Sequence, residues 1–196
     1  MKKLINPRTG VLILIILSAA AWRILMASGH SSLSNFTPVG AMALFAGFYF
    51  KNKWKAYLVP LLTLWCSDLL LCYFVYYHKL TWFYDGFLWT YGSFALMVTI
   101  GSLMKKVNVI NIIVASLIAS GVHLILTDLG VWLSGSCIVN GQPYTKDFSG
   151  LMNCYYQALP YMGNMLIGNL VFGAILFGGF ELAQRKYPAL QISQQQ

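Results

Sequence analysis

Charged residues are scarce in this 196-residue sequence: lysine, arginine, aspartate and glutamate together make up 9%, and only five residues are acidic. In soluble domains roughly a quarter of the residues are charged. The chain is instead 58% hydrophobic, with a mean hydropathy of +0.65. This composition predicts an all-α integral membrane protein, because a helix satisfies its own backbone hydrogen bonds where no water is present.

The sequence also lacks the short motifs of common enzyme classes. It has no GxxxxGK[ST] loop, no GxSxG, no HExxH and no GxGxxG ahead of a helix. No nucleophile–base pair or metal cluster can be assembled from its spacing, so we expect no enzyme, no cofactor and no metal site. The net charge of +8 does not indicate a nucleic-acid partner, because the basic residues fall in short connections between apolar segments.

Apolar segments recur along the whole chain. Because a span needs about 20 residues, we expect a bundle of six transmembrane helices. They are placed at residues 10–28, 36–50, 56–77, 87–104, 108–133 and 154–182. The second helix is short and begins at the stretch NFTP (35–38), which predicts an irregular outer end. We assign residues 1–190 to a single transmembrane domain and residues 191–196 to a polar C-terminal tail.

Basic residues alternate between the two sides of the predicted spans. One side holds Lys2, Lys3, Arg8, Lys51, Lys53, Lys55, Lys105, Lys106, Arg185 and Lys186. The other side holds only Lys79 and Lys146. The positive-inside rule then predicts a multi-pass membrane protein with both termini in the cytoplasm.

Ionisable residues inside predicted spans are the first candidates for function. Asp68 lies near the middle of the third span, where a charge is costly and should face the bundle interior. It either contacts a ligand or cation, or pairs with Arg23 or a hydroxyl and sets helix register. Arg23 itself either snorkels to the interface or, like His30 after it, holds an anionic or polar ligand group.

Polar residues in the fifth and sixth spans follow a five-residue spacing. His123 and Asp128 lie about 140° apart in helical projection, so they do not share a face and do not form a metal pair. Asp128, closer to the outer end, is the better pocket candidate, and His123 is interpreted as an interhelical hydrogen-bonding residue. Asn164 and Asn169 are interpreted first as packing residues and second as a polar lining for a small molecule.

The four cysteines fall into two groups. Cys137 and Cys154 lie near the predicted outer surface, where a disulfide could close residues 134–153 over the outer mouth in an oxidising compartment. Cys66 and Cys72 lie nearly opposite one another on their helix, so we expect both to be packing residues.

Two stretches resemble a family of bacterial membrane proteins related to the S components, the substrate-binding subunits of energy-coupling factor vitamin transporters. They are NFTPVGAMALFAG (35–47) and LMNCYYQALP (151–160), which continues to Asn164, and the step Ser67-Asp68 between them is also similar. The resemblance implies six spans in the bacterial cytoplasmic membrane, an outward-facing pocket for a micronutrient, and docking on a T component coupled to two ATPases. One similar branch binds cobalamin through a cysteine thiolate, but the corresponding residues 78–85 here lack cysteine.

The leading hypothesis is therefore a subunit that captures a small, vitamin-like solute in an outer pocket, within membrane lipid, with a T component and ATPases as partners. Its ligand-binding residues are predicted to be His30, Asn35, Phe36, Pro38, Asp68, Trp82, Tyr84, Asp128 and Asn164. Arg23, His123 and Asn169 are assigned to ligand binding or packing. A corrinoid is the alternative substrate, and a membrane scaffold or envelope-assembly protein is the alternative function. The aromatic content favours a ring-containing solute.

Overall fold

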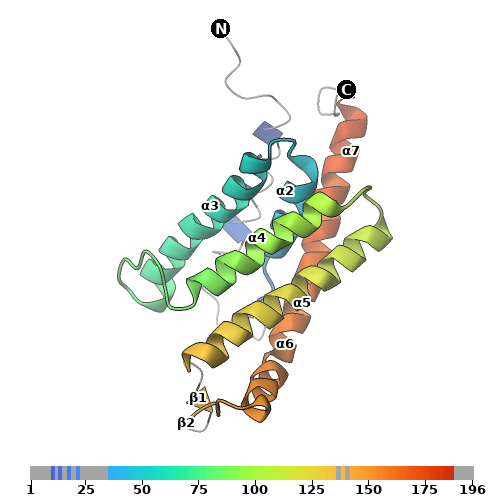
Figure 1. Cartoon of the computed structure of the whole chain (residues 1–196). Coiled ribbons are helices and arrows are strands. Elements are labelled where there is room, and N and C mark those ends of the chain that lie inside the picture. The colour runs from blue at the N-terminus through green and yellow to red at the C-terminus, as the bar shows by residue number, and fades with distance from the viewer. Residues whose placement is uncertain are drawn as a thin grey trace.

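A computed structural model describes residues 10, 11, 13, 14, 17, 18, 21, 22, 35–135, 138, 139 and 142–187. These residues are predominantly helical (Figure 1). The helices are α2 (Val39–Tyr49), α3 (Lys53–Leu71), α4 (Phe87–Leu103), α5 (Val109–Ser134), α6 (Phe148–Gly173) and α7 (Gly179–Lys186). Two π-helical segments, η1 (Cys72–Tyr76) and η2 (Ala174–Gly178), continue α3 and connect α6 to α7. Strands β1 (Ile138–Val139) and β2 (Gln142–Pro143) pair antiparallel between α5 and α6.

Three continuous helices are long and apolar enough to cross a membrane: Lys53–Tyr76, Val109–Ser134 and Phe148–Lys186. Two further apolar helices, α2 and α4, are shorter, at 11 and 17 residues. The eight described residues between positions 10 and 22 are helical, but most of the first predicted span lies outside the described residues. The protein is thus a helical chain with membrane-spanning character, and the count of six spans stays a prediction.

Several predicted boundaries were wrong by a few residues, and capping side chains explain two of them. The last helix begins at Phe148, not 154, because the Asp147 carboxylate accepts a hydrogen bond from the Gly150 amide at 2.7 Å. That helix also continues to residue 186, four residues past the expected end. Likewise, α3 begins three residues early because Asn52 accepts from the amides of Trp54 and Lys55. Such caps satisfy amides that a helix start leaves without partners.

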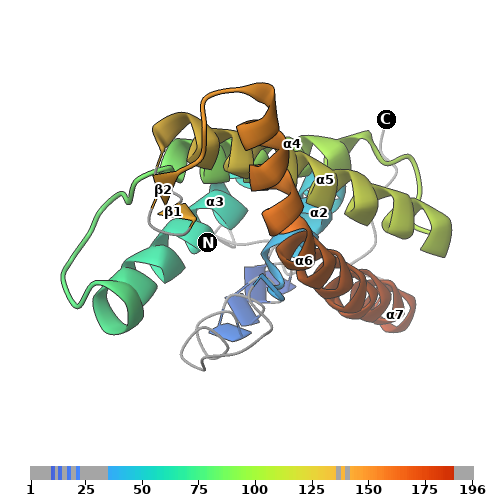
Figure 2. The same cartoon turned by 90° about the horizontal axis from the view of Figure 1, so that it is seen from below.

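Helix α2 forms the centre of the core. It is apolar on all sides, and every residue except Phe48 is buried, as expected for a helix enclosed by others. It packs against α3, α4, α5 and α6, and Figures 1 and 2 both show it enclosed among its neighbours. Its irregular start is confirmed: residues 35–38 are not helical, and Asn35 has a positive φ of 69°.

The α2–α4 crossing is unusually close because each helix contributes a glycine. A Cβ on Gly47 would overlap the carbonyl oxygen of Val98, and a Cβ on Gly101 would overlap that of Leu44. Gly47 thus provides close helix contact within the chain, as small residues do between membrane helices.

Aromatic rings fill the space between α2 and the end of the long C-terminal helix. Phe45 lies 5.4 Å from Phe177 and 5.6 Å from Phe180, measured between ring centroids and nearly edge-to-face. The hydroxyl of Tyr49 donates a hydrogen bond to the Glu181 carboxylate. These contacts tie α2 to η2 and α7.

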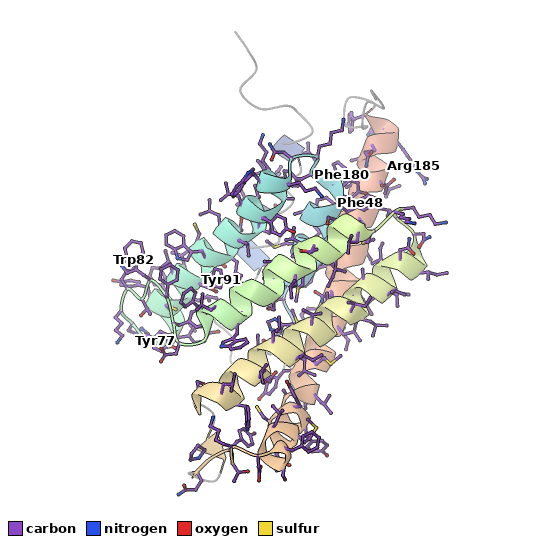
Figure 3. All side chains as sticks on the ribbon, viewed as in Figure 1. Phe48, Tyr77, Trp82, Tyr91, Phe180 and Arg185 are labelled. Atoms are coloured by element: carbon purple, nitrogen blue, oxygen red, sulfur yellow. The ribbon has the colours of Figure 1, made fainter. Side chains whose placement is uncertain are left out.

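Basic residues gather at one end of the bundle, which we call the basic end. It comprises the start of α3, the α4–α5 connection and the end of α7, and carries Lys51, Lys53, Lys55, Lys105, Lys106, Arg185 and Lys186. Figure 3 shows Arg185 at this end and Tyr77 and Trp82 at the other, which we call the opposite end. The opposite end holds the connection 77–86 and the strands β1 and β2.

Candidate ligand site

The opposite end of the bundle contains a cavity of about 480 Å³. Its lining comes from the last turns of α3, the first turns of α4, the second half of α5, the first half of α6 and the start of α2. Its polar lining residues are Asn35, Thr37, Asp68, Tyr76, Tyr77, Tyr84, Thr90, Ser120, His123, Thr127, Asp128 and Tyr161. No lysine or arginine is among the described residues that line it. The cavity therefore offers carboxylates, hydroxyls and an imidazole.

Asp68 contributes a buried carboxylate from the C-terminal half of α3. Its side chain is only 6% exposed, and the hydroxyl of Tyr91 on α4 donates a hydrogen bond to its Oδ2 at 2.8 Å. Figure 3 shows Tyr91 between the two helices. The predicted alternative partner, Arg23, lies outside the described residues. Asp68 thus both lines the cavity and links α3 to α4.

The π-helical turn η1 shapes the wall beside Asp68. A π-turn adds a residue to a helical turn and occurs frequently at functional sites. Here it follows Leu71 directly, and Leu71, Cys72, Tyr76 and Tyr77 all line the cavity. Tyr76 and Tyr77 are more than half exposed, so they lie at the rim.

Helix α5 supplies a continuous stripe of lining residues. Residues 120, 123, 124, 127, 128 and 131 recur at helical spacing along the cavity. His123 and Asp128, about 140° apart, form the two edges of this stripe. The sequence placed them on different faces, yet both line the same cavity because the lining stripe spans the whole arc between them.

Two lining residues of α5 also make interhelical hydrogen bonds. His123 Nδ1 lies 2.8 Å from the Ser93 hydroxyl of α4, in agreement with its predicted interhelical role. The Ser120 hydroxyl accepts a bond from Asn169 Nδ2 of α6 at 3.0 Å. The polar groups at the cavity wall therefore also position α4 and α6 against α5.

Asp128 differs from these residues in its surroundings. Its carboxylate is half-buried, and among the described residues the only side chain that donates a hydrogen bond to it is Thr127, at 3.4 Å. The backbone oxygen of Asp128 accepts from Cys154 Sγ at 3.5 Å. Unlike the Asp68 carboxylate, the Asp128 carboxylate therefore makes no described hydrogen bond to another helix.

Other predicted site residues near the start of α2 have separate positions. Asn35 lines the cavity. The ring of Phe36 instead packs 5.5 Å from that of Phe172, and Pro38 is buried at the start of α2. His30 lies outside the described residues. Of the predicted residues in this segment, Asn35 lines the cavity, as does Thr37, which was not predicted.

The connection 77–86 and α6 also contribute less than predicted. Tyr84 lines the cavity, whereas Trp82 is exposed and stacks on Trp65, with ring centroids 5.9 Å apart. Asn164 is half-buried and does not line the cavity. The fully buried Asn169 does not line it either, but it donates a hydrogen bond to the lining residue Ser120. These positions match the packing interpretation of Asn169.

The predicted disulfide stays a prediction, because Cys137 lies outside the described residues. Cys154 is buried, and its Sγ donates to a backbone oxygen of α5 as given above. Cys66 is exposed on α3, contrary to its expected packing role, whereas Cys72 is buried as predicted.

The sequence argument missed several lining residues. Tyr76, Tyr77, Tyr161 and Thr90 line the cavity, and none of them belongs to a sequence motif. Two of the missed residues could have been found from their positions along the helices. Thr90 follows the start of α4 in the segment opposite Asp68, and Thr127 lies one helical turn after His123.

A comparison with protein-family models matches residues 3–190 to DUF6580, a family of unknown function. The chain belongs to the DUF6580 family. No curated protein and no solved structure shows significant similarity to it. Membership of DUF6580 covers nearly the whole chain, including every residue of the cavity wall, so the cavity is a feature of the matched region.

Proposed function

We propose that this DUF6580 protein captures a small solute in the cavity at the opposite end of the bundle. The observation that carries the proposal is the cavity itself, in which Asp68, Asp128 and His123 converge with hydroxyls and aromatic rings from several helices. Its volume of about 480 Å³ lies within the range of small-molecule sites. Ionisable groups at membrane depth also favour a functional site.

The lining favours a solute that donates hydrogen bonds and carries a ring. Carboxylates accept hydrogen bonds and attract positive charge, while Phe94 and the tyrosine rings provide flat apolar surface. A vitamin-sized molecule fits this volume, whereas a whole corrinoid is too large to be enclosed. We therefore favour the smaller micronutrient over the corrinoid.

The proposal includes the topology inferred from charge. The basic end would face the cytoplasm of a bacterial cell, both termini would lie there, and the cavity would open outward from a six-span bundle in the cytoplasmic membrane. Capture at the outer side suits a transport subunit that delivers its solute to a T component with ATPases. In support, the cavity and the basic residues occupy opposite ends of the described bundle.

The scaffold alternative also has support, because Asp68, His123 and Asn169 all make hydrogen bonds between helices. It predicts that substitutions in the cavity lower stability without loss of any specific ligand. A substitution at Asp128 distinguishes solute capture from the scaffold function, because its carboxylate makes no described hydrogen bond to another helix.

The test is native mass spectrometry of protein in mild detergent, after incubation with a small-molecule extract of the expressing cells. We expect a defined non-lipid adduct on the wild type that Asp128→Asn loses while its melting temperature is retained. Asp85→Asn is the matched control, because Asp85 is an exposed carboxylate at the same end and outside the cavity. Absence of a non-lipid adduct from the wild type, or its equal loss from both variants, would contradict the proposal.

A further inference from the structure

A second concave surface lies between α4 and α5 at the basic end. It is a groove of about 590 Å³, and it shares no residue with the cavity. Its apolar part includes the exposed side chains of Leu103 on α4 and of Val114 and Ile118 on α5. One end is formed by Lys105 and Lys106.

The charge at this end of the groove is of one sign. Lys105 and Lys106 are both exposed, and none of the chain's five carboxylates lines the groove. Asp68 and Asp128 line the cavity, Asp85 and Asp147 belong to connections at the opposite end, and Glu181 bonds to Tyr49. Among the described residues, the two ammonium groups therefore have no competing acidic side chain in the groove.

The connection that carries the lysines is held to the start of α5. Asn111 Nδ2 donates to the Lys106 carbonyl at 2.9 Å, and the Asn108 side chain caps the helix by accepting from the Asn111 amide at 2.7 Å. The backbone of the connection is thus fixed beside the positive end of the α5 dipole. This arrangement adds a further preference for an anion next to the lysines.

We propose that this groove binds one anionic phospholipid, with a phosphate headgroup at Lys105 and Lys106 and an acyl chain along the apolar strip between α4 and α5. An amphiphile is the occupant that matches both parts, because the strip is apolar and ends in two cations. Basic pockets between transmembrane helices recognise anionic headgroups in this way. The site is independent of solute capture in the cavity.

The experiment titrates the full-length protein in mild detergent with phosphatidylglycerol or phosphatidylcholine and counts bound lipids by native mass spectrometry. We expect the wild type to bind the first phosphatidylglycerol roughly 10- to 30-fold more tightly than phosphatidylcholine, from two lysines near the headgroup. Lys105→Gln with Lys106→Gln should remove most of that preference. The matched control is Lys53→Gln with Lys55→Gln, which changes two exposed lysines of the basic end outside the groove.

A third variant tests the apolar part. Val114→Trp keeps both lysines and fills the strip, so it should weaken phosphatidylglycerol binding; unchanged binding would indicate a phosphate site without a lipid groove and overturn the proposal. Equal losses in the control and in the groove lysine variant would indicate general surface attraction and would also overturn it. Melting temperatures of all variants show whether each is folded.

Discussion

The crossing of α2 and α4 leads to a prediction about stability. The backbones meet where Gly101 faces Leu44 and Gly47 faces Val98, with no side chain between them. A Cβ on Gly101 would lie 2.8 Å from the Leu44 Cα, whereas ordinary contact begins at 3.4 Å. The neighbour is backbone and cannot rotate away. Gly101→Ala must therefore push the two helices apart.

The expected change in the free energy of unfolding for Gly101→Ala is the balance of two opposing effects. Replacing glycine by alanine inside a helix favours folding by up to about 1 kcal/mol. Overpacking in a core costs about 1–3 kcal/mol, and a separation of roughly 0.5–1 Å forfeits a quarter to a half of the local dispersion energy. Because α2 is buried on all sides, we expect Gly101→Ala to lower the free energy of unfolding by about 1–2 kcal/mol.

The control is Gly92→Ala in the same helix. A Cβ on Gly92 would have no neighbour within 4 Å, so alanine there should be neutral or stabilising. Differential scanning fluorimetry in mild detergent would measure both, and a loss of about 1–2 kcal/mol corresponds to roughly 2–8 °C for a chain of this size. If Gly101→Ala melts at or above the wild-type temperature, the close crossing is wrong.

Three further predictions concern hydrogen bonds. Tyr91→Phe removes a donor from the buried Asp68 carboxylate and should cost about 1–3 kcal/mol in thermal or denaturant unfolding; an unchanged midpoint would contradict the bond. Tyr49→Phe removes the bond to Glu181 and should cost about 1 kcal/mol in the same assay; an unchanged midpoint would show that α7 does not dock at Tyr49. Hydrogen bonds from the Gly150 amide and the Thr145 hydroxyl lower the pKa of Asp147 below its usual 3.8, so its carboxylate stabilises the fold above that pH and less as pH falls through the native pKa. The stability gap between wild type and Asp147→Ala should narrow below pH 4, and a gap that widens would refute this assignment.

The positions of the helices could be predicted well from apolar periodicity. The expected 87–104 and 108–133 correspond to Phe87–Leu103 and Val109–Ser134. The start of the last helix was misplaced because residues 134–153 were assigned to the connection before it, although the Asp147 carboxylate caps a helix that begins at Phe148. Periodicity reports which segments bury apolar surface, whereas a cap depends on one side chain at one position.

The candidate site could be predicted only in part. Asp68 and Asp128 were identified because a carboxylate in an apolar segment is costly anywhere in the sequence. Tyr77 could not be identified in the same way, since its place at the rim depends on the π-turn η1 and on the connection after it. Trp82 is outside the lining and its ring stacks on Trp65, so its contact with a ligand stays a prediction.

Polar residues in a membrane bundle can serve packing and binding at once, and this chain shows how the two can be separated. Asp68 and His123 line the cavity, but each also bonds to α4, so substitution of either changes helix packing together with the lining. Asp128 lines the same cavity, and the described donor to its carboxylate is its own neighbour, Thr127. A change at Asp128 therefore alters the chemistry of the cavity while leaving the interhelical bonds in place. Whether its loss removes a ligand or only changes stability distinguishes solute capture from a scaffold.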